Sequence, residues 1–281
     1  MSRLFIARNH RRGSGLAAWR RSPRRRARRG SGHLFDRWAA VHSQLVAAAR
    51  VALFLDFDGT LAPLAAHPDQ VRLDRNLRKL MARLARISRI TVCIISGRRL
   101  ADLRRRARVP GANYVGVHGW ESEGAGQARG IPQFMHRLKA RLGKVLGKMP
   151  GVWVEDKGIS CAVHHRAATQ SLVRRARRAF RQAVDPLAGI VRVMKGKKIW
   201  EVMPADSPGK GEAVVEFLAG MEIPALAVYV GDDTTDESAF AALRQGITVR
   251  VGPARRTLAR FRLRDPREVH VFLTRVAEEM S

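Results

Sequence analysis

The chain alternates between continuous apolar runs and segments whose apolar residues recur every three or four positions. Residues 51–57 ("VALFLDF") and 89–96 ("RITVCIIS") are mostly apolar and predict buried strands, whereas residues 73–88 ("LDRNLRKLMARLARIS") predict an amphipathic helix. Further strands are predicted over 113–119, 225–231 and 246–252, and further helices over 98–107, over 210–221 and after "DDTTDE". This alternation indicates an α/β fold, in which helices cover both faces of a parallel sheet.

The middle of the chain has a different pattern. Residues 132–149 and 168–184 predict helices, and each is followed by two short strands around a tight turn, at 151–166 and 189–204. Helix–hairpin–helix–hairpin is an α+β pattern, so we predict an inserted domain at 126–204. Residues 46–125 and 205–281 would then form the α/β core.

The chain is strongly basic, with a formal net charge of +29 and a sequence pI near 11.7. The first fifty residues contain thirteen arginines and one acid, and we predict that residues 1–45 form a disordered basic arm. We interpret the excess charge as a solvated arginine-rich surface, with attraction of the basic arm to nucleic acid or anionic lipid as the alternative. No spaced aromatic residues or nucleic-acid-binding module support the alternative.

Cysteine usage and hydropathy suggest where the protein works. Cys93 and Cys161 both lie in apolar, strand-like runs, which suits a reducing compartment. No run approaches the length of a transmembrane helix, and the N-terminus lacks the apolar segment of a secretory signal. We therefore expect a cytoplasmic protein, and we expect it to be monomeric.

The clearest candidate for chemistry is "LFLDFDGTLAP" at the end of the first predicted strand. Residues i and i+2 of a strand face the same side, so Asp56 and Asp58 are predicted to point together at its carboxyl end, where open parallel sheets bind ligands. Two adjacent carboxylates repel, and either a hard cation such as Mg²⁺ or a shared proton would relieve this. Gly59 allows a sharp turn, and the Thr60 hydroxyl could hold a carboxylate or a phosphoryl oxygen.

This motif resembles the first motif of the haloacid-dehalogenase-like phosphohydrolase superfamily. The superfamily's other motifs follow in order: "CIISGR" with Ser96, Gly97 and Arg98, "SPGKGEAV" with Lys210, and "VYVGDDTTDE" with Asp232, Asp233 and Asp236. The resemblance implies a Rossmann-like parallel-sheet core with an inserted cap domain.

The resemblance also implies a mechanism. Asp56 would attack phosphorus and form an aspartyl-phosphate, and Asp58 would serve as general acid and then as base. Asp56, Asp232 and the main-chain carbonyl of Asp58 would hold Mg²⁺, with Asp233 and Asp236 as further metal candidates. Ser96 and Lys210 would orient the phosphoryl oxygens, and Thr60 would belong to the same catalytic set. Ser96, Gly97, Arg98 and His118 would also contact the substrate.

A finer resemblance covers residues 48–281 and is to the trehalose-6-phosphate phosphatase family. It rests on "GDDTTDE", "VEDKGISCAVHHR" and "KGKKIWEVMP". It implies trehalose 6-phosphate as the small-molecule substrate and places His118 near the active site. It also implies a set of sugar-binding residues in the cap: Glu155, Lys157, His164, Arg166, Lys197 and Glu201.

Three alternatives remain open from the sequence. The substrate could be another sugar phosphate, such as sucrose phosphate or mannosylglycerate phosphate. A phosphomutase shares the first motif but would return the phosphoryl group to its sugar. A polyanion-binding protein without catalysis would use the basic surface, although it gains nothing from clustered acids.

Overall fold

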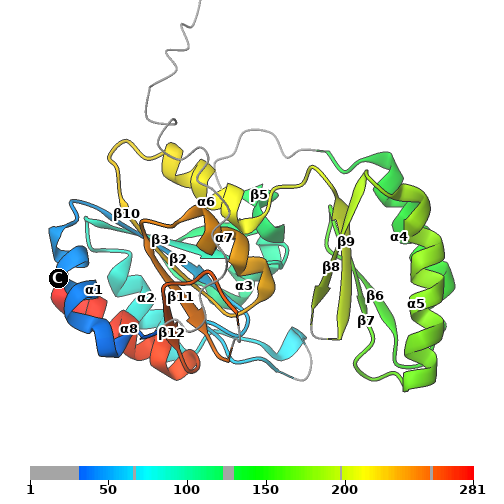
Figure 1. Cartoon of the computed structure of the whole chain (residues 1–281), viewed down its shortest axis with the longest axis horizontal. Helices are drawn as coiled ribbons and strands as arrows, with labels where there is room; N and C mark the ends of the chain where they lie inside the picture. Colours follow the sequence, from blue (N-terminus) through cyan, green and yellow to red (C-terminus); the bar gives the residue numbers. More distant parts are fainter. Residues whose placement is uncertain (1–31, 66–67, 123–129, 197, 254–255) are drawn as a thin grey trace, which may run out of the picture.

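The computed structural model describes residues 32–65, 68–122, 130–196, 198–253 and 256–281. Two sheets organise them (Figure 1). The larger has eight strands in the order β1-β12-β11-β10-β2-β3-β4-β5, and every neighbouring pair is parallel except β4 and β5. Its strands are β1 (Gly32–His33), β2 (Val51–Asp56), β3 (Ile90–Ile95), β4 (Asn113–Gly116), β5 (Glu121–Ser122), β10 (Leu226–Gly231), β11 (Ile247–Val251) and β12 (Phe261–Leu263).

Strand β2 lies at the centre of this sheet, and alternate side chains pack on opposite faces. Leu53 and Leu55 belong to the apolar cluster that includes residues of four helices, whereas Ala52 and Phe54 belong to the cluster on the other face. The first four helices are α1 (Trp38–Ala47), α2 (Arg75–Leu84), α3 (Leu100–Ala107) and α8 (Pro266–Glu279), and the opposite face is covered by α6 (Lys210–Ala219) and α7 (Glu237–Ala242). The predicted α/β class is confirmed.

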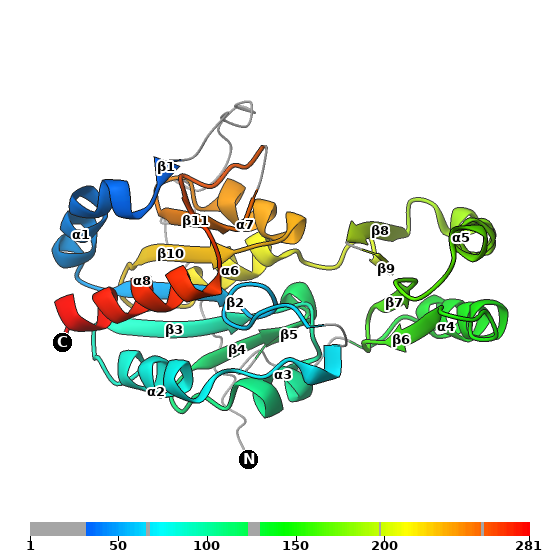
Figure 2. The ribbon, with the colours of Figure 1, turned by 90° about the horizontal axis from the view of Figure 1, so that it is seen from below.

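The smaller sheet is antiparallel and has the order β6-β7-β9-β8. It is built from two helix–hairpin units, as predicted, and both helices lie on the side away from the larger sheet (Figures 1 and 2). Its elements are α4 (Gln133–Leu146), β6 (Trp153–Asp156), β7 (Cys161–His164), α5 (Gln170–Val184), β8 (Val191–Gly196) and β9 (Ile199–Pro204). We refer to this unit as the cap, and to the rest as the core.

Short 3₁₀ turns connect several of these elements: η2 (Phe35–Arg37), η3 (Pro68–Gln70), η4 (Val117–Gly119), η5 (Asp185–Leu187) and η6 (Thr234–Asp236). Of these, η4 and η6 border the site described below. Among the described helices, none combines the length and apolar character that crossing a bilayer requires.

The predicted basic arm is wrong for its last fourteen residues. Residues 32–45 include β1, which pairs with β12, and most of α1. Leu34, Val41 and Leu45 are fully buried in the core cluster. Burial of these three side chains, each worth about 1.5–3 kcal/mol, stabilises the segment against the sheet despite its low apolar content. Residues 1–31 lie outside the described part of the chain.

Candidate active site

A cavity of about 670 Å³ lies between core and cap and is lined by residues of both. On the core side it is bordered by the segments that follow β2, β3 and β10, as expected for the carboxyl ends of parallel strands. On the cap side it is lined by β6, β7, β8 and β9. Most of the residues that the sequence singled out line this one cavity.

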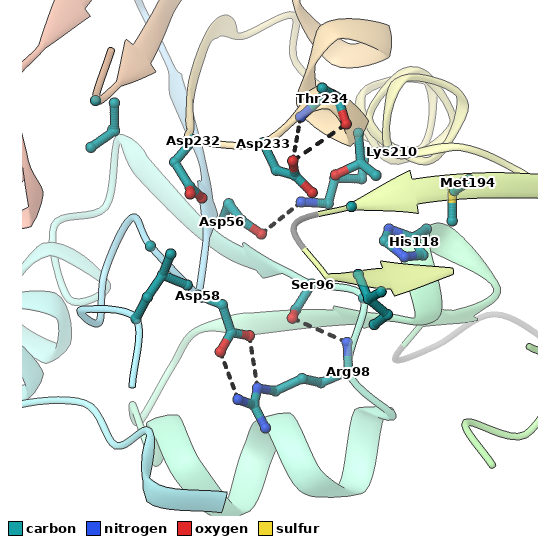
Figure 3. Close-up of a pocket in the computed structure, with 18 of the residues that line it drawn as sticks. Asp56, Asp58, Ser96, Arg98, His118, Met194, Lys210, Asp232, Asp233 and Thr234 are labelled. Carbon is teal, nitrogen blue, oxygen red and sulfur yellow. Dashed lines mark hydrogen bonds and ion pairs between the residues drawn. The ribbon is translucent and has the colours of Figure 1, made fainter. Parts of the chain in front are cut away.

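Asp56 is the last residue of β2 and is 4% exposed. Lys210, the first residue of α6, donates from Nζ to Asp56 Oδ1 at 2.6 Å (Figure 3). The same Nζ donates to Asp236 Oδ1 at 2.7 Å. Burial lowers the pKa of Lys210, but the charges of Asp236 and Asp56 outweigh burial and raise that pKa above its usual value. Lys210 is therefore a fixed cation beside Asp56.

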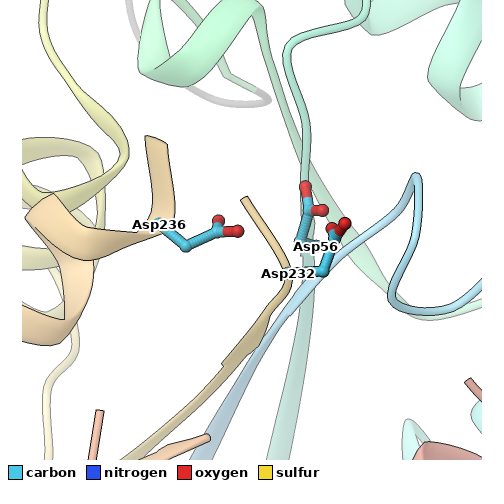
Figure 4. Close-up of side chains that lie close together, drawn as sticks. All are labelled: Asp56, Asp232 and Asp236. Carbon is cyan, nitrogen blue, oxygen red and sulfur yellow. The ribbon is translucent and has the colours of Figure 1, made fainter. Parts of the chain in front are cut away.

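The carboxylates of Asp56, Asp232 and Asp236 form one cluster, with one oxygen of each within 4.8 Å of the others (Figure 4). Burial raises the pKa of Asp56 well above its usual value, and the charges of Asp236 and Asp232 add to this against the effect of Lys210. Burial and the charge of Asp236 likewise raise the pKa of Asp232 to about 6. Three acids facing one lysine leave an excess of negative charge, and carboxylate oxygens are suitable ligands for a hard divalent cation.

Two glycines allow these carboxylates to approach. Gly59 has φ +84, and a Cβ atom there would lie 2.2 Å from Asp232 Oδ2. A Cβ atom on Gly231 would lie 2.3 Å from Asp236 Cγ. Any side chain at either position would therefore displace an acid of the cluster.

The predicted metal-binding acids differ in how many hydrogen bonds their carboxylates already accept. Asp236 is fully buried, and its oxygens already accept from Lys210, from the Tyr229 hydroxyl at 2.8 Å and from the Asp233 amide at 2.8 Å. The Asp233 carboxylate accepts from the Thr234 amide at 2.7 Å and caps η6. Asp56 and Asp232 are thus the better-placed candidates for binding a metal, and the ligand role of each of the four acids stays a prediction.

Asp58 does not point with Asp56 toward Lys210. It accepts two hydrogen bonds from the Arg98 guanidinium, at 2.7 Å from Nε and 2.6 Å from Nη2. Arg98 Nη1 also donates to Asp102 Oδ2 at 3.0 Å. Arg98 is thus paired with Asp58 in this structure, and a role for Arg98 in binding substrate stays a prediction.

The remaining core residues lie as follows. Thr60 is fully buried and donates to Asp232 Oδ1 at 3.3 Å, so its hydroxyl holds a carboxylate. Ser96 lines the cavity and its Oγ accepts from the Arg98 amide at 3.1 Å. Gly97 also lines the cavity and packs against the His118 ring.

His118 joins the core to the cap. Val117 and His118 both have left-handed backbone, with φ 46 and 57, which costs about 1–3 kcal/mol for each such residue. The segment is held by hydrogen bonds to the loop after β3, from the Val117 amide to the Arg98 carbonyl and from the His118 amide to the Ser96 carbonyl. His118 Nε2 lies 3.7 Å from Glu201 Oε2 of the cap.

On the cap wall, Glu201 is the centre of a polar network. It accepts from Ser160 Oγ at 2.6 Å and from Lys157 Nζ at 3.2 Å. Burial raises the pKa of Glu201, but the charge of Lys157 and the contacts with His118 and Ser160 outweigh burial, so the pKa is well below its usual value. The pKa of Lys157 is raised, since the charges of Glu201 and Glu155 outweigh burial.

The other predicted cap residues lie around this network. Glu155 accepts from His164 Nε2 at 2.7 Å, and the His164 ring stacks on Trp153 with centroids 4.4 Å apart. Arg166 lines the cavity and is 3.5 Å from the Ala65 carbonyl of the core. Lys197 lies outside the described residues.

Sequence reasoning missed Ser160, Tyr229 and Asp102. Ser160 lies inside the motif that carries Glu155 and Lys157, so its place next to a buried strand was a usable signal. Tyr229 reads as an ordinary core aromatic, and the Asp102–Arg98 contact depends on side-chain conformation. Neither leaves a signal in the sequence.

Comparisons with known proteins agree with this geometry. Residues 54–267 match the family described as Trehalose-phosphatase. The trehalose-phosphate phosphatase of Mycobacterium avium (strain 104) is 36% identical over 250 residues, which cover 82% of this chain and 63% of that protein. The trehalose-phosphate phosphatase of Mycobacterium tuberculosis (strain ATCC 25618 / H37Rv) is 33% identical, with 83% of this chain and 63% of that protein covered. The chain thus spans less than two thirds of the length of these curated relatives.

Solved structures share the fold. The C-terminal domain of the C. albicans trehalose-6-phosphate phosphatase superposes with a TM-score of 0.77 at 23% identity and covers 90% of this chain and all of that domain. A trehalose-6-phosphate phosphatase related protein superposes with a TM-score of 0.69 at 25% identity, and the superposition covers 81% of this chain and 97% of that protein's chain. Because the family match includes the core motifs and the entire cap that share the cavity, the chain belongs to the trehalose-phosphatase family.

Proposed function

We propose that the protein hydrolyses trehalose 6-phosphate to trehalose and inorganic phosphate. The observation that carries this proposal is the shared cavity, in which Asp56 and Lys210 face the polar network around Glu201. One wall suits a phosphoryl group and the other suits sugar hydroxyls. Family membership supports the choice of sugar.

Asp56 is the proposed nucleophile. Its carboxylate would attack phosphorus, forming an oxygen–phosphorus bond as the bond between phosphorus and the sugar oxygen breaks. Lys210 offsets the charge of Asp56. Its hydrogen bonds to Asp56 and Asp236 hold the ammonium group at the cavity, where it would also stabilise the charge of a phosphoryl oxygen. The Ser96 hydroxyl would donate a hydrogen bond to an oxygen of the same phosphoryl group.

Asp58 is the proposed general acid and base. Protonated, it would donate to the departing sugar oxygen, and the resulting carboxylate would take a proton from the water that hydrolyses the aspartyl-phosphate. To do so it must leave Arg98, which holds it by two hydrogen bonds. A phosphate dianion is a competing partner for a guanidinium, so substrate binding would free Asp58.

Mg²⁺ is the proposed cofactor, and Asp56 and Asp232 fit it as carboxylate ligands in a site with excess negative charge. When bound, it would polarise the phosphoryl oxygens and offset the charge that develops on them.

Proton competition gives this proposal a test that does not depend on turnover. Mg²⁺ binds the ionised carboxylate, and the pKa of Asp232 is raised to about 6 in the metal-free protein. In that protein the raised pKa makes folding favour protonated Asp232, so its contribution to stability declines as pH rises from the ordinary 3.8 to about 6. We therefore expect the increase in melting temperature caused by Mg²⁺, relative to EDTA, to be largest above this pH and to shrink as pH falls below it.

Thermal unfolding over a pH series, with Mg²⁺ or EDTA, measures this difference. Taking the difference at each pH cancels groups that do not bind metal. The Asp232→Asn variant is the control and should show little Mg²⁺-dependent increase at any pH. In the parent protein, a Mg²⁺-dependent increase in melting temperature that does not change with pH would contradict Asp232 as a Mg²⁺ ligand.

The sugar assignment is tested by phosphate release from trehalose 6-phosphate, sucrose 6-phosphate, glucose 6-phosphate and mannose 6-phosphate with Mg²⁺. A site whose buried polar groups pair with substrate hydroxyls discriminates by large factors, so we expect a preference for trehalose 6-phosphate of about a hundredfold or more in kcat/KM. Glu201→Gln should reduce this preference while leaving hydrolysis of p-nitrophenyl phosphate nearly unchanged.

The outcomes separate the parts of the proposal. Preference for another sugar phosphate would support the proposed phosphatase activity and contradict trehalose 6-phosphate as the substrate. Hydrolysis of p-nitrophenyl phosphate alone would reject the cap's role in sugar binding. No phosphate release from any of these esters would reject the phosphatase.

A further inference from the structure

Helix α5 presents a row of arginines to solvent. Arg174, Arg175, Arg177, Arg178 and Arg181 are all exposed, while the opposite side of the helix packs in the apolar cluster of the cap. Four of them, at positions 174, 177, 178 and 181, also line a shallow hollow of about 510 Å³, together with Gln182 and the carboxylate-bearing Asp185. These spacings of three and four residues place the guanidinium groups along one side of the helix.

Helix α4 packs beside α5 and extends the same surface. Arg137, Arg141 and Lys144 are exposed on α4, and Lys148 is exposed just after it. We call the exposed basic side chains of these two helices the outer cap face. The helices lie on the far side of the cap sheet from the core, so this face points away from the cavity (Figures 1 and 2).

Few acidic side chains lie near the outer cap face within the described chain. Residues 130–185 contain three acids, Glu155, Asp156 and Asp185, and of these Asp185 lines the hollow beside the arginines without an ion pair to any of them at salt-bridge distance. Glu155 is paired with His164 and Asp156 with Lys139. None of the basic residues of the face forms an ion pair with a described carboxylate.

This arrangement opposes folding of the cap rather than assisting it. Like charges three or four residues apart on a helix destabilise it by about 0.2–0.5 kcal/mol per pair. Arg174 repels Arg177 and Arg178 in this way, and Arg178 repels Arg181. A bound polyanion would remove the repulsion, whereas the proposed hydrolysis requires none of these residues.

We propose that the outer cap face binds the phosphodiester backbone of double-stranded nucleic acid. Guanidinium groups pair with phosphate through two hydrogen bonds, and a row of them matches a regularly charged backbone. The binding would be independent of base sequence and would leave the cavity accessible.

The side chains around the arginines favour a duplex over other polyanions. Phe134 and Phe180, the phenylalanines of the two helices, pack in the apolar cluster of the cap and offer no platform for unstacked bases. Val145, at 42%, is the single exposed large apolar residue described on α4 and α5, so the face has little with which to enter a lipid layer.

The test uses the full chain and a fluorescent DNA duplex of about 25 base pairs, whose binding is measured over a salt series. One variant replaces Arg174, Arg177, Arg178 and Arg181 with glutamine. The matched control replaces four exposed basic residues of the core with glutamine, and so changes the net charge equally: Arg75, Lys79, Arg86 and Arg267. Residues 1–31 are the same in both variants.

We expect the cap variant to bind the duplex about tenfold more weakly than the control and its salt slope to fall by about 3 to 4, since each lost phosphate contact removes about 0.9 from the slope. Phosphate release should match that of the parent chain, and the melting temperature should equal or exceed the parental value, because the variant removes like-charge repulsion along α5. Equal weakening of duplex binding in both variants would overturn the proposal, because it would show that binding follows the net positive charge of the whole protein and not the outer cap face. Preferential binding of single strands, or binding of anionic phosphatidylglycerol vesicles but not of duplex, would also overturn it.

Discussion

Replacing Asp56 with asparagine is expected to reduce phosphate release by about a thousandfold or more, because the amide cannot attack phosphorus. Asparagine keeps the shape of aspartate, and Lys210 retains Asp236 as a partner. The loss should therefore appear in kcat and not in folding. Single-turnover phosphate release measures it directly.

The control for this variant is its stability in EDTA, where we expect a melting temperature within a few degrees of the parent protein. A folded Asp56→Asn variant that retains more than about 1% of parental turnover would contradict nucleophilic catalysis by Asp56. The same variant should also show a smaller increase in melting temperature with Mg²⁺, because one proposed ligand has lost its charge.

Replacing Lys210 with methionine is expected to affect both activity and folding. Lys210 is 3% exposed and is held 2.6 Å from Asp56 and 2.7 Å from Asp236. Its removal leaves buried carboxylates without their cation, which costs about 3–5 kcal/mol in the free energy of unfolding. Turnover should fall by about a thousandfold, since the phosphoryl group loses a fixed positive charge.

Urea unfolding and phosphate release distinguish these two effects. Adding Asp236→Asn to Lys210→Met removes one of the two buried carboxylates that Lys210 holds, so the double variant should regain part of the lost stability without regaining activity. Parental stability in the Lys210→Met single variant would show that the ion pair is not needed to offset the acids.

The fold was predictable where burial leaves a recognisable pattern of apolar residues in the sequence. Strands β2, β3, β10 and β11 are covered on both faces, so each is a continuous apolar run in the sequence. The segment before β2 was assigned wrongly, because α1 contains only two buried residues, Val41 and Leu45, among alanines and polar residues. Its contacts come from β12 and α8, which are distant in sequence and invisible to a local pattern.

The site was predictable in its parts but not in its pairings. The motifs placed Asp56, Lys210 and Asp232 around one cavity. The same motifs did not indicate that Arg98 holds Asp58, since that contact depends on how two side chains turn across the loops after β2 and β3. Nor did they reveal the contact of His118 with Glu201, which depends on left-handed backbone at two non-glycine residues.

The absence of side chains at Gly59 and Gly231 bears on how natural variation in this family should be interpreted. An alanine at either position changes no charge and removes no catalytic group, yet its Cβ atom would occupy the space of Asp232 or Asp236. A genome survey that scores relatives only by their acidic residues would therefore count inactive genes as functional. Whether a relative has inherited a working centre depends as much on retaining these two smallest residues as on retaining the carboxylates.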